Sequence, residues 1–183
     1  PGAVHAPHHV PQAWIDRWKG KFDQGWDKLR EEILVRQIKL GIVPEDTELA
    51  PRPDAFPAWD SLSEPERKLY ARQMEVFAGF SENADWNVGR LLDSVEEMGE
   101  LDNTLVIYIW GDNGASMEGT TTGSFNETTF FNGVVLDAEE QLELIDLLAQ
   151  GERSVDALAA ATGVNLTTVS AHLQTLRQPH LVA

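Results

Sequence analysis

Cysteine is absent from the 183 residues of this chain. Without a thiol, the chain has no disulfide framework, no thiolate metal site and no cysteine nucleophile. Long apolar runs are also missing: none approaches the roughly 18 residues that cross a membrane. The N-terminal stretch "PGAVHAPHHVPQAW" lacks the basic start and apolar core of a signal peptide. We therefore expect a soluble, cytoplasmic protein with no membrane partner.

Basic residues are scarce, with 14 Lys+Arg against 30 Asp+Glu and a formal charge of −16. Residues 147–183 hold two of each sign, so the whole acidic excess lies in residues 1–146. A strongly acidic surface disfavours nucleic-acid binding by the first region. Residues 147–183 carry no net charge, so the charge argument does not exclude nucleic-acid binding by them.

Helical patterns dominate the chain. Residues 1–11, with three prolines and three histidines, predict a loop. Residues 26–41 and 64–98 show apolar positions near helical spacing, and each pattern ends at a glycine, Gly41 and Gly99. Four prolines between residues 43 and 62 predict a surface connection between these two helices.

Residues 105–110 form a β-branched and aromatic run that is too short for a helix and predicts a buried strand. Asp112 and Asn113 follow it directly, at the end of the strand where open α/β sheets collect ligands. Carboxylate and amide oxygens suit Ca²⁺ or Mg²⁺, although a full site needs six or more oxygens. The alternative from the residues alone is a plain Asn-Gly turn.

The end of the chain predicts further helices. Asp137 and Glu140 form a capping box for a helix. Residues 154–178 then give a short helix, a turn at Gly163 and a second helix, with the spacing of a helix-turn-helix. Two ordinary helices joined by a tight turn are the alternative.

Ordered blocks of the sequence resemble one enzyme family. They are "PGAVHAPHHVP", "GKFDQGWDKLREE", "YARQMEVFAGFSENADWNVGRLLDSVEEMGELDNTLVIYIWGDNGASMEG" and "GSFNETTFFNGVVLDAEEQLELI". Together they are similar to a bacterial arylsulfatase of the type I sulfatase family, which has the alkaline-phosphatase-like fold, over residues 1–146. The resemblance implies that Asp112 and Asn113 are ligands of the catalytic cation, usually calcium. It also implies that His5 contacts the sulfate group, whereas His8 and His9 match no catalytic position.

The departures from that family concern the nucleophile. Family members carry, upstream of the "HAP" region, two further metal aspartates and a cysteine or serine that is oxidised to formylglycine; the hydrated aldehyde attacks sulfur. Here "SEPER", Ser63 to Arg67, has the spacing of the maturation signal but follows "HAP". We interpret Ser63 and Glu66 as a helix capping box and assign no nucleophile. The C-terminal family segment with its catalytic lysine also has no match, so we expect the isolated chain to be inactive.

The last residues resemble a different family. "LLAQGERSVDALAAATGVNLTTVSAHLQTLRQ" is similar to winged-helix repressors of the arsenic-repressor (ArsR) type. That resemblance implies that the second helix lies in the major groove of DNA. The implied contacts are Thr167, Thr168, Ser170, His172, Gln174 and Arg177. The wing and the dimerising helices have no match, and Arg153 and Arg177 are the cations of residues 147–183, so weak DNA binding is expected.

The two resemblances predict a chimera of two partial domains. Residues 1–146 would be a partial sulfatase domain, an α/β fragment that is largely helical with at least one buried strand. Residues 147–183 would be a partial, all-α, ArsR-type DNA-binding domain. The functional hypotheses are a sulfatase segment with an incomplete Ca²⁺ or Mg²⁺ site for a sulfate ester, a DNA-binding module, or an inactive remnant. An uncovered apolar strand would favour self-association.

Overall fold

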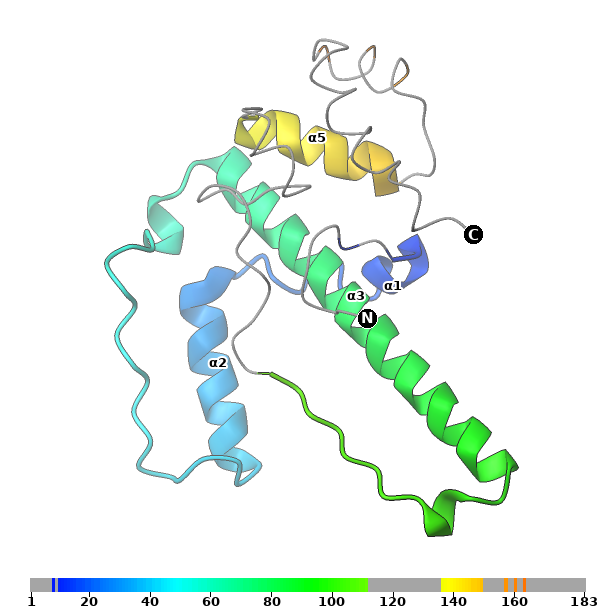
Figure 1. The fold of residues 1–183 in the computed structure, drawn as a ribbon. Helices are drawn as coiled ribbons and strands as arrows, with labels where there is room; N and C mark the ends of the chain where they lie inside the picture. The colour runs from blue at the N-terminus through cyan, green and yellow to red at the C-terminus, as the bar shows by residue number, and fades with distance from the viewer. Residues whose placement is uncertain are drawn as a thin grey trace.

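The computed structural model describes His8, residues 10–111 and 136–149, and the single residues Ala157, Ala160 and Gly163. Its elements are α1 (Gln12–Asp16), α2 (Gly25–Lys39), η1 (Trp59–Ser61), α3 (Glu64–Glu97), η2 (Leu101–Asn103) and α5 (Ala138–Ala149) (Figure 1). No β-strand occurs within these described ranges. Nor is any described helix both long and apolar enough to span a bilayer.

Helix α3 is the longest described helix, and α1, α5 and η2 contact it. The predicted capping box at its start is present: the Ser63 hydroxyl accepts from the Glu66 N–H, and the Glu66 carboxylate accepts from the Ser63 N–H at 2.8 Å. Its predicted end is also confirmed, because Gly99 follows the helix with φ +73°. Helices α1 and α5 both pack against α3, α5 across its N-terminal end (Figure 1).

The core lies where the first half of α3 meets η1 and the turn before α2. Leu69 is fully buried. A separate cluster of buried apolar residues consists of Phe22, Trp59, Leu62, Ala71 and Ala78, and Trp18, Trp26, Leu29 and Tyr70 pack against it. Trp26 stands at 79° to Trp59 with ring centroids 4.9 Å apart, an edge-to-face packing that adds to simple area burial.

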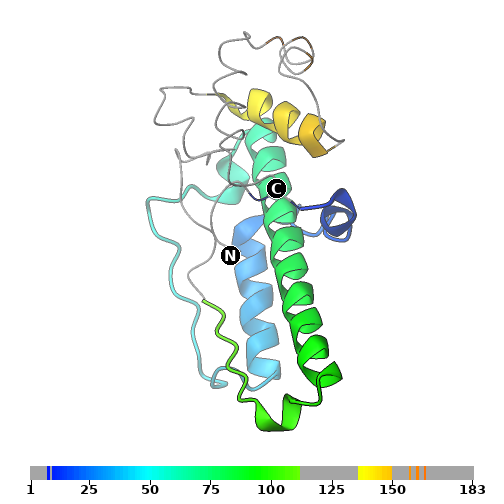
Figure 2. The same ribbon diagram turned by 45° about the vertical axis from the view of Figure 1, so that its right-hand side comes forward.

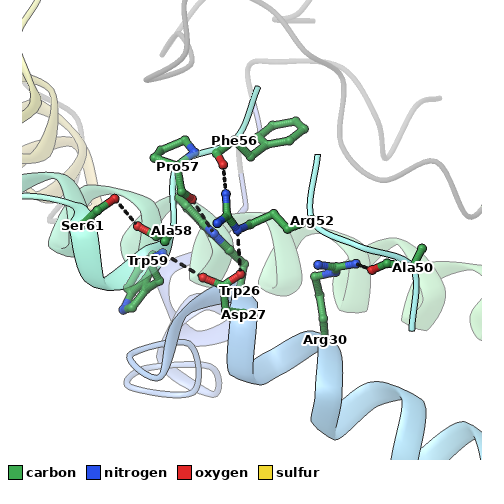
Figure 3. A network of polar contacts seen from close by, with 10 residues as sticks. All are labelled: Trp26, Asp27, Arg30, Ala50, Arg52, Phe56, Pro57, Ala58, Trp59 and Ser61. Carbon is green, nitrogen blue, oxygen red and sulfur yellow. Dashed lines mark hydrogen bonds and ion pairs between the residues drawn. The ribbon is translucent and has the colours of Figure 1, made fainter. Parts of the chain in front are cut away.

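The connection between α2 and η1 is held by polar contacts rather than by apolar packing (Figure 3). The Asp27 carboxylate accepts from the Trp59 N–H at 2.9 Å and pairs with Arg52 Nε at 3.1 Å. The Trp26 indole N–H donates to the Pro57 carbonyl at 3.2 Å. These bonds fix a proline-rich segment that the sequence predicted as a surface connection.

Helix α5 begins with the predicted Asp137 and Glu140 capping box, whose two bonds are 2.9 and 3.0 Å long. It buries Leu144 and Gln141. The Arg72 side chain, on α3, joins the two helices by an ion pair with Asp146 at 3.0 Å. The same guanidinium pairs with the buried Glu75 carboxylate at 2.9 Å, so α5 is tied to a charged pair inside the molecule.

The prediction of a buried strand at residues 105–110 is wrong for the described structure. The backbone of residues 104–111 has no helix or strand assignment, and all eight residues are exposed. Leu105 is 85% exposed and Ile109 is 84% exposed. A strand needs a hydrogen-bonded neighbour to become part of a sheet, and none of the described residues supplies one.

Candidate functional site

The residues that the sequence predicted for the cation and sulfate sites, Asp112, Asn113 and His5, lie outside the described residues. The structure describes the chain that leads to Asp112 and Asn113 as far as Gly111, which immediately precedes Asp112. The last part of this stretch, residues 104–111, is here named the strand segment. It is the described part of the chain that leads to the two predicted cation ligands.

The strand segment has two different faces. Leu105, Ile107 and Ile109 are 72–85% exposed, whereas Val106, Tyr108 and Trp110 are 45–53% exposed. Alternation of this kind is the two-residue period of extended backbone. One face of the segment is therefore partly covered and the other is bare.

The partly covered face borders an apolar groove between α2 and α3 with a volume of about 790 Å³. The apolar side chains that line this groove are Trp18, Phe22, Leu29, Ile33, Phe77 and Ala78. Tyr108 and Trp110 of the strand segment line the same groove. Figures 1 and 2 both show the segment returning from the far end of α3 toward the middle of the molecule.

Tyr108 fastens the strand segment to α3. Its hydroxyl donates to an Asp85 carboxylate oxygen at 3.1 Å. Desolvation, followed by the hydrogen bond and the charge of Asp85, raises the pKa of Tyr108. A tyrosine of ordinary pKa, about 10, is already protonated at neutral pH, so the phenol is a donor there.

Two acidic side chains of α3 hold the segment before α2 in place. Glu82 accepts from Arg17 and from the Trp18 indole N–H, each at 2.8 Å. Glu75 accepts from the Gly20 N–H at 2.7 Å while it pairs with Arg72. These carboxylates already have partners inside the protein, which fits a structural role rather than a catalytic one.

His8 is the described member of the histidine-rich loop. Its ring lies 5.4 Å from Phe77 and 5.3 Å from Phe80, measured between centroids. His8 therefore packs against α3, and it stands three residues after His5 in the sequence. No role for His8 was predicted from the sequence, because no local pattern pairs a loop histidine with residues of a helix about 70 positions later.

Ser63 has the structural role that the sequence predicted. Besides accepting from Glu66, its hydroxyl donates to a Glu66 carboxylate oxygen at 2.6 Å. The Ser63 hydroxyl is thus engaged both as a donor and as an acceptor at the start of α3. No group of three or more His, Cys, Asp or Glu side chains suited to a metal ion occurs within residues 10–111 and 136–149.

The candidate DNA contacts Thr167, Thr168, Ser170, His172, Gln174 and Arg177 also lie outside the described residues. Of the residues that precede these candidates in the predicted helix-turn-helix, the structure describes Ala157, Ala160 and Gly163. Ala157 and Ala160 are helical, and Gly163 has φ +69°, the left-handed conformation expected of a glycine in the predicted turn. The complete helix-turn-helix stays a prediction.

Comparison with known proteins identifies relatives for most of the chain. The family model described as Sulfatase matches residues 1–171. An uncharacterized sulfatase of Schizosaccharomyces pombe is 40% identical over 114 residues, which are 62% of this chain and 20% of that protein. An arylsulfatase of Klebsiella aerogenes is 33% identical over 114 residues, 62% of this chain and 24% of that protein. The match thus spans a fifth to a quarter of these relatives.

A relative of another kind was also found. An HTH-type transcriptional regulator of Mycobacterium tuberculosis is 56% identical over 50 residues, which are 27% of this chain and 22% of that protein. This similarity is consistent with a chimera without showing an ArsR type. The family model, in contrast, covers most of the chain, and the chain therefore belongs to the sulfatase family.

Proposed function

We propose that this chain supplies the cation-binding and sulfate-contacting part of a sulfuric ester hydrolase site, with aryl sulfates as the substrate class. The observation that carries the proposal is the sulfatase match over residues 1–171, which contains the strand segment and the two oxygen ligands after it. Asp112 and Asn113 are the proposed cation ligands. His5, three residues before the α3-anchored His8, is the proposed sulfate contact.

The donor chemistry of Asp112 and Asn113 fits a hard cation. One carboxylate and one amide oxygen suit Ca²⁺ or Mg²⁺, but they are two of the six or more oxygens such an ion takes. A bound cation would supply positive charge next to the sulfate oxygens. The proposed role of this chain is to present two cation ligands on consecutive residues. It would also bring the His5 imidazole, a hydrogen-bond donor to an anion, to the sulfate.

Calcium titration tests the cation proposal. We expect weak binding, in the millimolar range typical of sites with few ligands, and at least a tenfold loss in the Asp112→Ala variant. The matched control is Asp102→Ala, which removes a carboxylate of η2 ten positions earlier, before the strand segment rather than after it. Equal calcium affinity in the unmodified chain, Asp112→Ala and Asp102→Ala would mean that Asp112 is a turn residue and not a cation ligand.

The reactive nucleophile is not assigned to any residue of this chain. The 183 residues contain no cysteine, and Ser63 is engaged in the cap of α3. We therefore expect the purified chain to release no nitrophenol from nitrophenyl sulfate, with or without calcium. Release above the blank that is lost in Asp112→Ala would show that the nucleophile is present after all.

A second function, DNA binding by the end of the chain, is favoured by the similarity to the M. tuberculosis regulator. Thr167, Thr168, Ser170, His172, Gln174 and Arg177 are the proposed contacts. Since Arg153 and Arg177 are the cations of residues 147–183, phosphate contacts are few and affinity is expected to fall with a shallow salt slope.

Retention of random duplex DNA by the full chain at low salt tests this second function. We expect weak retention that disappears as salt is raised and that is reduced by Arg177→Ala. Arg90→Ala is the matched control, because Arg90 lies on α3 in the acidic region, over the Trp86 ring. Absence of retention at low salt would exclude DNA binding by this chain.

A further inference from the structure

The groove between α2 and α3 contains a buried polar group that has no partner. The Ser81 hydroxyl, on α3, is shielded from solvent and makes no hydrogen bond with any of the described residues. Ser81 lines the groove, whose volume of about 790 Å³ falls within the roughly 300–1,000 Å³ of small-molecule sites. A buried hydroxyl without a partner carries a desolvation cost, which an oxygen of a ligand in the groove would offset.

The charged side chains that line the groove differ in whether they are already paired. The three carboxylates, Glu32, Glu82 and Asp85, each accept a hydrogen bond from a neighbouring side chain. The two cations, Lys21 and Arg36, have no carboxylate within ion-pair distance among the described residues. The unpaired charges of the groove are therefore positive, which favours an anionic ligand.

Arg36 and Ser81 lie at about the same level of the groove. Trp26 on α2 packs against Tyr70 on α3, with ring centroids 5.4 Å apart. From this contact both helices run in the same direction (Figures 1 and 2), and Arg36 comes ten residues after Trp26 while Ser81 comes eleven after Tyr70. At a rise of about 1.5 Å per residue, these spacings are roughly 15 and 17 Å. Lys21 precedes α2, so Arg36 is the unpaired cation at the level of Ser81.

Aromatic rings line much of the groove. Trp18, Phe22 and Phe77 contribute to its walls, and Tyr108 and Trp110 of the strand segment line it as well. The last two are 51% and 53% exposed, so a ring that enters the groove has aromatic surface to cover. Aromatic pairs gain more from packing in offset-stacked or edge-to-face geometry than their buried area alone provides. The walls therefore favour a ligand with an aromatic body over one with an alkyl chain.

We infer that the groove between α2 and α3 is a binding site for a small aromatic anion. The aromatic body of the ligand lies between the two helices, the Arg36 guanidinium pairs with its anionic head, and the Ser81 hydroxyl donates to an oxygen of that head. A sulfate ester and a carboxylate share this chemistry. The site shares no residue with the proposed cation and sulfate contacts Asp112, Asn113 and His5, so it does not rest on the proposed function.

The test is calorimetric titration of the full chain with four probes: naphthyl sulfate, naphthoate, neutral naphthol and octyl sulfate. We expect at least one of the two aromatic anions to bind with one-to-one stoichiometry. Its affinity should be at least tenfold higher than that of naphthol, which lacks the charge, and of octyl sulfate, which lacks the ring. The ratio between naphthyl sulfate and naphthoate tells whether the site prefers a sulfate ester or a carboxylate head.

Two variants test the polar contacts of the site. Arg36→Ala is expected to weaken binding of the aromatic anion at least tenfold. Its matched control is Lys39→Ala, which removes an exposed cation from the same last turn of α2 that does not line the groove, and which should change the affinity less than twofold. Ser81→Ala should weaken binding about fivefold and yet raise the urea midpoint of the free chain, because it removes a buried hydroxyl without a partner.

A third variant, Ile33→Trp, places a large ring in the groove from a position that is 39% exposed, and it is expected to abolish binding. The inference is overturned if no probe binds, if naphthol or octyl sulfate binds as tightly as the aromatic anions, or if Arg36→Ala and Lys39→Ala lose affinity equally. Binding that survives Ile33→Trp would also overturn it. Binding that survives Asp112→Ala supports a site in the groove, whereas its loss there would assign the anion to the proposed cation site instead.

Discussion

The first half of α3 and the strand segment contain similar side chains but differ sharply in burial. Leu69 is fully buried and Trp59, in η1, is 7% exposed, whereas Leu105 is 85% exposed and Trp110 is 53% exposed. A helix makes its backbone hydrogen bonds within itself and needs only one apolar partner face. A central strand needs neighbours on both edges and both faces. The described residues therefore bury the apolar side chains of the first half of α3 but leave those of the strand segment exposed.

The largest expected effect contrasts one leucine from each region. Leu69→Ala should lower the free energy of unfolding by about 2–5 kcal/mol, because it leaves a cavity in the packed core. Leu105→Ala should change it by less than about 0.5 kcal/mol, as for other exposed side chains. Urea unfolding of both variants measures the difference, and equal losses would mean that the strand segment is buried in solution.

The next effect concerns the charged link between α3 and α5. Arg72→Ala should destabilise the protein by about 3 kcal/mol, because it leaves the buried Glu75 carboxylate without its cation. Asp146→Ala should cost no more than about 1 kcal/mol, since Asp146 is 52% exposed and solvent screens its pair with Arg72. Urea titrations measure the free energy of unfolding of both variants. A larger loss of this free energy in Asp146→Ala than in Arg72→Ala would contradict the prediction.

The smallest effect is the pH dependence of the cap at the start of α3. Hydrogen bonds from the Ser63 hydroxyl and backbone lower the pKa of Glu66 below its usual 4.5. A lowered folded-state pKa means that the cap stabilises the protein above pH 4.5 and loses this contribution as the pH falls through the lowered value. Glu66→Gln keeps the capping geometry without the titration. The difference in melting temperature between the two proteins should therefore shrink below pH 4.5, and a constant difference would exclude titration of Glu66 as its source.

The sequence predicted well what depends on neighbouring residues. The capping residues Ser63 and Asp137 and the helix-ending glycines act within one turn, and the structure confirms all of these. The five-residue helix α1 was missed because it follows Pro11 without a side-chain cap. It is held instead by close approach to α3: a Cβ at Gly79 would lie 2.9 Å from the Ile15 nitrogen.

Contacts between residues far apart in the chain could not be predicted from the sequence. Arg72 and Asp146 are 74 positions apart, and Tyr108 and Asp85 are 23 apart, so no local pattern pairs them. The buried strand was predicted from the right composition, but its burial depends on strands that the described residues do not include. For the candidate site, the family is confirmed. The roles of Asp112, Asn113 and His5 stay predictions, since spacing alone fits a turn as well as a cation site.

The most direct measurement is hydrogen exchange along the chain at a concentration where sedimentation shows a monomer. The account predicts slow exchange in the first half of α3, around Leu69, and fast exchange at residues 105–110, where no described residue forms a sheet ladder. Exchange at residues 105–110 as slow as that around Leu69 would contradict it, because the strand segment would then already be covered by the chain itself.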